Sequence, residues 1–114
     1  MNNIRLTAYF LKKAKRLLKK YHTLQTSLKQ LEKELLLDPK IGDSYGFNIY
    51  KIRLADESKG KGKSGGFRVV TYLIEQTSDT TNIYLITIFD KSEESSIDKD
   101  DIKKILRAEG LLKN

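Results

Sequence analysis

Residues 83–89 form an almost continuously apolar run, Ile-Tyr-Leu-Ile-Thr-Ile-Phe, in a chain of which 32% is charged. A run of this kind is typical of a central strand that is buried on both faces of a sheet. Residues 67–75, which precede it, are rich in β-branched and aromatic side chains, and residues 47–55 alternate imperfectly between apolar and polar positions. Because these three runs follow one another with loops between them, we expect an antiparallel meander.

The N-terminal part of the chain has the spacing of two amphipathic helices. Apolar side chains recur at helical intervals over residues 10–21, and Thr7 is placed to cap this first helix. The second helix is expected at about residues 23–37. It ends at Asp38-Pro39, because the residue before a proline is disfavoured in a helix. Two consecutive helices joined by a short turn predict a helical hairpin whose apolar faces need a sheet to cover them.

A short strand at residues 4–7 opens the chain, and a helix at residues 99–109 closes it, with Asp98 as its cap and Gly110 as its stop. The expected order is strand, helix, helix, strand, strand, strand, helix. We therefore predict one α+β domain over residues 1–114. In this domain a small, mainly antiparallel sheet is packed on one face by the N-terminal helical hairpin and is followed by a C-terminal helix.

The formal net charge of +7 is unevenly distributed along the chain. Residues 1–31 contain eight lysines or arginines and no acidic residue, whereas residues 90–101 contain six acidic residues and two lysines. Such asymmetry favours a polyanionic partner. The chain has no cysteine and a single histidine, which excludes disulfides, thiolate chemistry and metal sites built on several histidines. No stretch approaches the roughly 20 apolar residues that span a bilayer, and none resembles a signal peptide, so we expect a cytoplasmic protein without a membrane partner.

A basic, glycine-rich segment separates the first two strands of the predicted meander. Lys59, Lys61 and Lys63 alternate there with glycines, which allow the backbone to approach a ligand closely. Arg53 and Arg68 lie within the flanking strands, where a cation either faces water or serves a specific purpose. Because no metal ligands lie nearby in the sequence, these cations predict a phosphate-rich partner, with RNA or DNA as the first candidate.

Several segments, taken in order, match one known family. They are the basic helix from Phe10 to Tyr21, the Asp38-Pro39 and Gly42 spacing, Tyr50-Lys51-Ile52-Arg53-Leu54-Ala55, Gly62-Lys63-Ser64-Gly65-Gly66-Phe67-Arg68-Val69-Val70, Ile83-Tyr84-Leu85-Ile86 and Phe89-Asp90-Lys91-Ser92. Through this ordered combination, from about residue 4 to residue 106, the chain resembles the RelE/HigB-type toxins of bacterial type II toxin–antitoxin modules.

The resemblance implies a RelE-like fold and an mRNA endoribonuclease that cuts within codons on the translating ribosome and is silenced by a cognate antitoxin. By position, it implies catalytic cations at Arg53, Arg68 and Lys91, together with either Lys61 or Lys63. We provisionally assign Lys63 to catalysis and Lys61 to RNA binding. The further residues expected to bind RNA phosphates by charge are Lys59, Lys12, Lys13 and Arg16.

RNA can be cut in this way without a metal or a cofactor. The 2′-hydroxyl attacks the adjacent phosphorus, and a 2′,3′-cyclic phosphate and a 5′-hydroxyl result. Arg68 is the expected phosphate clamp, because its planar fork can hold two phosphate oxygens, and Arg53 shares this role. Lys63 would supply charge or take part in proton transfer, and Lys91 would complete the pocket.

The general base is not identified by the pattern. Some relatives carry a tyrosine, or a histidine and an aspartate, near the C-terminal part of the site, and the segment after Lys91 has neither an aromatic residue nor a histidine. Tyr72 and Asp90 are therefore the candidate bases.

Two other functions are compatible with the same pattern. One is a toxin of the ParE-like branch, which inhibits DNA gyrase and has no nuclease activity. The other is a non-catalytic domain that binds RNA or a protein partner. If the protein is a toxin of either kind, its expected partners include an antitoxin with an acidic, partly disordered segment.

Overall fold

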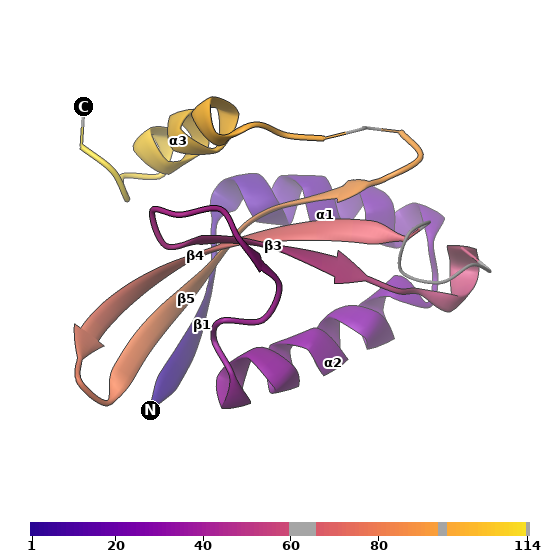
Figure 1. The fold of residues 1–114 in the computed structure, drawn as a ribbon. Helices are drawn as coiled ribbons and strands as arrows, with labels where there is room; N and C mark the ends of the chain where they lie inside the picture. The colour runs from indigo at the N-terminus through magenta and orange to yellow at the C-terminus, as the bar shows by residue number, and fades with distance from the viewer. Residues whose placement is uncertain (60–65, 94–95, 114) are drawn as a thin grey trace.

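The computed structural model describes residues 1–59, 66–93 and 96–113 of the chain. These residues form an α+β fold around a five-stranded mixed sheet, in which the strand order is β1-β5-β4-β3-β2 (Figure 1). In chain order the elements are β1 (Asn2–Leu6), α1 (Ala8–Lys20), α2 (Leu24–Leu37), β2 (Asp43–Ser44), β3 (Ile49–Leu54), a 3₁₀ turn η1 (Glu57–Lys59), β4 (Phe67–Thr77), β5 (Thr80–Asp90) and α3 (Lys99–Ala108).

The predicted meander is confirmed, since β3, β4 and β5 pair in sequence and antiparallel. The sheet as a whole is mixed, because β1 runs parallel to β5 with Ile4 opposite Ile83. The prediction of a mainly antiparallel sheet therefore holds for β2 to β5. The direction of β1 is a feature that the residues of a five-residue strand do not encode by themselves.

The strand predicted over residues 47–55 begins at Ile49 in the structure, two residues later than expected. Phe47 and Asn48 have positive φ angles of 56° and 61°, which belong to a turn rather than to a strand. Before this turn, Asp43 and Ser44 make the short strand β2 and pair with β3. The result is a hairpin at the edge of the sheet that the sequence pattern did not predict.

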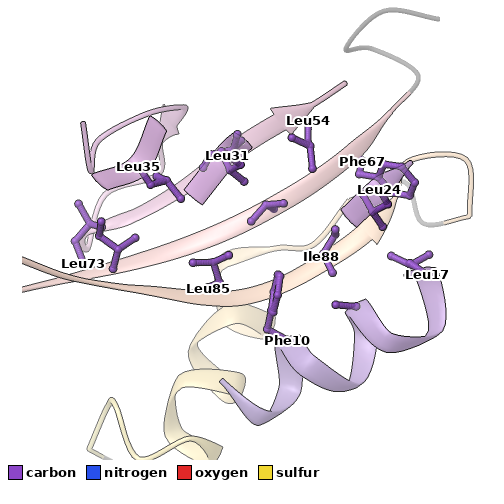
Figure 2. Packing of buried hydrophobic residues seen from close by; sticks show 14 residues of the cluster. Phe10, Leu17, Leu24, Leu31, Leu35, Leu54, Phe67, Leu73, Leu85 and Ile88 are labelled. Carbon is purple, nitrogen blue, oxygen red and sulfur yellow. The ribbon is translucent and has the colours of Figure 1, made fainter. Parts of the chain in front are cut away.

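Both N-terminal helices cover the same face of the sheet, as predicted. Side chains of α1 such as Phe10 and Leu17, and of α2 such as Leu31 and Leu35, point toward the sheet and join one apolar cluster with β3, β4 and β5 (Figure 2). Figure 1 shows the two helices diverging from the turn that joins them, so they form a splayed pair across the sheet. Burial of this cluster, rather than helix–helix contact, holds them in place.

The third helix, α3, lies on the opposite face of the sheet. Its buried residues Ile102 and Leu106 join a second apolar cluster with Ile49, Val70 and Ile86 of the central strands. The fold therefore has three layers, with α1 and α2 on one side, the sheet in the middle and α3 on the other.

Local capping signals in the sequence are confirmed at two helices. The Thr7 hydroxyl accepts a hydrogen bond from the backbone N–H of Phe10 at 3.0 Å and donates to the Leu85 carbonyl at 2.9 Å, so one side chain caps α1 and ties it to β5. The Asp98 carboxylate accepts from the backbone N–H of Asp101 at 2.8 Å and caps α3. Within the described residues, the structure has no helix with the length and apolar character needed to cross a membrane.

Candidate phosphate-binding site

Two arginines lie opposite each other on neighbouring strands. Arg53 of β3 pairs in register with Arg68 of β4. Residues opposite each other in an antiparallel pair project from the same face of the sheet. Because Ile52 and Leu54 project into the core beneath α1 and α2, alternation along the strand places the two arginines on the face that carries α3.

These arginines line a cavity of about 240 Å³ on that face. On β3 the contact with α3 is made by Ile49, so the helix packs over one end of the face, and Arg53 lies toward the other end. The described residues that line the cavity are Asp43, Tyr45, Lys51, Arg53, Arg68, Phe89, Lys91 and Ser96. Half of them are cationic, which makes the cavity suited to an oxyanion.

Lys91 reaches the cavity from the end of β5. Its backbone N–H donates to the Gly66 carbonyl at 3.2 Å, which fixes the start of its segment against the start of β4. Phe89, two residues earlier, lies opposite Arg68 and also lines the cavity. A Cβ at residue 66 would overlap the carbonyl oxygen of Leu54. Only glycine therefore allows the residue before β4 to lie so close to the end of β3.

Arg68 is the more enclosed of the two arginines, since it is half-buried whereas Arg53 is exposed at the edge of the sheet. Partial burial, reinforced by the positive charge of Arg53, lowers the pKa of the Arg68 guanidinium from its ordinary value. A guanidinium stays protonated at physiological pH even after such a shift. The pair therefore remains doubly charged at short range, an arrangement that a bound anion would stabilise.

A second charged cluster is buried on the face of the sheet that carries α1 and α2. The Lys59 ammonium is 2.8 Å from the Asp90 carboxylate, whose exposed fraction is 0%. The Tyr21 hydroxyl donates to the same carboxylate at 2.7 Å, and the Ser92 hydroxyl donates to its other oxygen at 2.7 Å. This cluster joins α1, η1 and the end of β5, next to Lys91.

This cluster bears on the roles that the sequence suggested for Asp90 and Lys59. Burial raises the pKa of the Asp90 carboxyl, but the hydrogen bonds from Lys59, Tyr21 and Ser92 outweigh it and hold the pKa far below its ordinary value. A carboxylate so strongly stabilised and enclosed is unsuited to act as a general base. Lys59 is engaged in this ion pair, which gives it a structural role, and its predicted RNA-binding role remains a prediction.

A similar cluster fixes the chain before the glycine-rich segment. Asp56, which is 5% exposed, accepts hydrogen bonds from the hydroxyls of Thr23, Ser27 and Ser58. Burial acts to raise the pKa of the Asp56 carboxyl, and these hydrogen bonds lower it by more. The turn between α1 and α2 is thereby tied to the chain that follows β3.

Tyr72, the other candidate base, lies away from the cavity. Its ring stacks on that of Phe47 at a centroid distance of 6.3 Å, and it packs against the cluster under α3. Tyr72 is absent from the described lining of the cavity. Tyr72 packs within the fold in this position, and its predicted role as a base remains a prediction.

The remaining predicted cations fall into two groups. Lys12, Lys13 and Arg16 lie on α1, across the sheet from Arg53 and Arg68, and Arg16 pairs with Glu93 at 3.2 Å. They are not brought together with the cavity. Lys61 and Lys63 lie outside the described residues, so their predicted roles remain predictions.

Five of the described lining residues were not singled out by the sequence, and three of them carry polar or charged groups next to the arginines, namely Lys51, Asp43 and Tyr45. Lys51 lies two residues before Arg53, and this spacing in a strand was the available signal that both share a face. Asp43 is opposite Lys51 through the β2–β3 pair. Tyr45 follows β2, and the Lys51 ammonium lies 4.4 Å from the centre of its ring. Asp43 and Tyr45 reach the cavity through the β2–β3 hairpin, which the sequence pattern did not predict.

The arrangement is suited to holding a phosphodiester. Two guanidiniums from a rigid pair of strands and two ammonium groups at the rim provide fixed donors for phosphate oxygens. No family model matches the sequence. In the described part of the chain, no group of three or more His, Cys, Asp or Glu side chains is arranged to hold a metal ion.

Proposed function

We propose that this chain is the toxin of a type II toxin–antitoxin module, with a RelE-like fold, and that it cleaves mRNA on the ribosome in the cytoplasm. The observation that supports the proposal best is the convergence of Arg53, Arg68 and Lys91 on one cavity. These three cations come from separate parts of the sequence, and the sequence pattern alone points to each of them. Four cations and a single carboxylate among the described lining residues favour a polyanionic substrate.

In this mechanism the scissile phosphate lies between Arg53 and Arg68. The guanidinium of Arg68 holds two phosphate oxygens, and its enclosure strengthens the interaction as negative charge grows on the phosphorane. The 2′-hydroxyl oxygen forms a bond to phosphorus, the bond to the 5′ oxygen breaks, and Lys91 stabilises or protonates the departing oxygen. The products are a 2′,3′-cyclic phosphate and a 5′-hydroxyl.

In this mechanism, most of the rate enhancement comes from stabilising the negative charge of the phosphorane. Asp90 and Tyr72 are engaged elsewhere in the fold, so in this proposal the ribosome contributes to removal of the 2′ proton. This division would tie the proposed activity to translating ribosomes. A cognate antitoxin would silence the toxin by placing an acidic segment over the cavity cations, and that segment would fold as it binds.

The test is a purified translation reaction in which mRNA 5′ ends are mapped after addition of the protein. Wild type should produce new 5′-hydroxyl ends within codons, and Arg68→Ala should not. Arg5→Ala is the matched control, because Arg5 is an exposed strand arginine on β1, at the opposite edge of the sheet. Intact mRNA with wild type would refute the proposal. Loss of supercoiling in a parallel gyrase assay would then support the ParE-like alternative.

A further inference from the structure

The cavity has an aromatic wall that the phosphate chemistry does not use. Tyr45 lines it from the turn after β2, beside Lys51, Arg53 and Arg68. Tyr45 is 41% exposed, whereas Phe67 and Phe89 are buried, so this fold encloses aromatic residues elsewhere. An exposed aromatic ring next to a cationic hollow is the combination with which proteins bind single-stranded nucleic acid.

The position of Tyr45 is fixed by the backbone around it. Its N–H donates to the carbonyl of Ile49 at 2.9 Å, which closes the turn between β2 and β3. Gly42 holds the start of this hairpin against β3, since a Cβ there would overlap the carbonyl oxygen of Lys51. The Lys51 ammonium, 4.4 Å from the ring centre, further orients the ring. The ring is thus presented to the cavity by a constrained hairpin.

We infer that Tyr45 forms a nucleobase subsite, on which the base next to the bound phosphate stacks. This inference rests on the proposed function for the identity of the ligand as RNA. Every nucleobase has an aromatic face, so the subsite would add affinity for a nucleotide over a bare phosphodiester with little preference among bases. Lys51, which contacts the ring, would lie between the base and the phosphate and could bind the phosphate oxygens.

The experiment measures binding of short oligonucleotides that cannot be cleaved. The probe is a 2′-O-methyl trinucleotide with 2-aminopurine at its centre, whose fluorescence is quenched when the base stacks. A second trinucleotide has an abasic residue at the same place. Wild type should quench the first probe and bind it at least about fivefold more tightly than the abasic one, the lower range expected for one stacked base.

Three variants locate the effect. Tyr45→Ala should bind both probes equally and without quenching, whereas Tyr45→Phe, which keeps the ring, should behave as wild type. Tyr9→Ala is the control, because Tyr9 is a comparably exposed tyrosine, at 38%, on α1 across the sheet. Its effect on both probes should be negligible.

Equal binding of the two trinucleotides to wild type would overturn the inference, as would quenching that survives in Tyr45→Ala or no binding of either probe. These outcomes are separate from those of the translation assay. If base-dependent binding is found without mRNA cleavage, the subsite stands and the ribonuclease proposal fails. If mRNA is cleaved but the abasic probe binds as well as the other, the ribonuclease proposal stands and the subsite fails.

Discussion

At the scale of single residues, Arg68 differs from the other cations of the cavity in how it is held. It projects from a central strand and is half-buried, whereas Lys91 lies just past a strand end and Arg53 lies at an exposed edge. Its side chain therefore loses little freedom when it binds an anion, and its donors keep one geometry. These features make Arg68 the residue on which the proposed activity depends most.

We expect Arg68→Ala to lower the rate of ribosome-dependent mRNA cleavage by about 10²–10³-fold, the usual loss for one preorganised donor. Arg68→Lys keeps the positive charge but loses the planar guanidinium, so its cleavage rate should fall between those of wild type and Arg68→Ala. The measurement is the initial rate of appearance of cleaved mRNA at saturating ribosomes. If Arg68→Lys proved as active as wild type, two-oxygen recognition by the guanidinium would have no part in the reaction.

The buried pair of Lys59 and Asp90 predicts a large effect on stability. Lys59→Met leaves the Asp90 carboxylate buried without its cation, and such a change costs about 3–5 kcal/mol in the free energy of unfolding. Urea denaturation at pH 7 measures it. Adding Asp90→Asn to Lys59→Met removes the buried charge and should recover much of the loss. A single variant as stable as wild type would show that the pair contributes little.

The same carboxyl predicts how stability depends on pH. Its pKa in the folded protein lies far below the ordinary value of 3.8, so the unfolded chain binds more protons when the pH falls through about 4. The stability that Asp90 contributes is therefore present above about pH 4 and is lost progressively as the pH decreases below it. Denaturation from pH 7 to pH 2.5 should show a steeper loss for wild type than for Asp90→Asn. Parallel curves would contradict the assignment.

At the scale of elements, the hairpin of β2 and β3 determines which residues reach the cavity. It brings Asp43 and Tyr45 beside Lys51, and it depends on Gly42, which has a φ of 103° and lies against the Lys51 carbonyl. A side chain at this position meets both backbone strain and a steric overlap. The edge of the site is thus set by one residue that has no functional group.

We expect Gly42→Ala to destabilise the protein by at least about 1–3 kcal/mol and to weaken binding of the 2-aminopurine trinucleotide. Gly110→Ala is the matched control, because Gly110 also has a positive φ, of 76°, but an added Cβ would have no atom within 4 Å. It should lose stability through the backbone alone and leave binding unchanged. Equal effects on binding would show that the hairpin does not shape the site.

Elements with local signals were predictable from the sequence. The caps at Thr7 and Asp98 act within one turn of their helices. The apolar pattern of the central strands reflects the burial of both of their faces, one under α1 and α2 and the other under α3. The strand β2 was not predictable, because two residues carry no period. The turn before β3 was also hidden, since Phe47 is a bulky residue in a conformation that such residues seldom adopt.

The same distinction holds for the site. Arg53 and Arg68 stood out because charged residues are unusual in strands, and the register of a meander brought them together. The commitment of Lys59 could not be read from its surroundings in the sequence, since its partner Asp90 is on another element and both are enclosed only in the folded chain. Nothing local separates a lysine that binds a ligand from one that neutralises a buried acid.

At the scale of the whole molecule, the three described helices do not pack over the whole of the sheet. The helices α1 and α2 cover one face, and α3 covers the part of the other face that lies over Ile49, Val70 and Ile86. The remaining part carries the cations of the cavity. Together with the net charge of +7, this arrangement gives the protein one cationic recess on a generally basic surface.

Binding of a single-stranded RNA oligonucleotide should therefore weaken as salt increases, with a slope of log K against log[salt] of about −0.7 for each phosphate contact. Arg53→Ala should make this slope shallower by about one contact. Lys33→Ala, which removes an exposed charge on α2, should leave it unchanged. Fluorescence anisotropy over a series of salt concentrations measures both. Identical slopes for the two variants would place the RNA elsewhere on the surface.

The opposed guanidiniums of Arg53 and Arg68 have one more consequence. Like charges directly across two strands work against the pairing that holds β3 to β4, so the ligand-free protein contains an internal repulsion at the centre of its site. An oxyanion seated there would relieve that repulsion as well as gain its own contacts. Inorganic phosphate or sulfate should therefore raise the melting temperature of the wild type by more than that of Arg53→Ala, and heat resistance would report whether the site is filled.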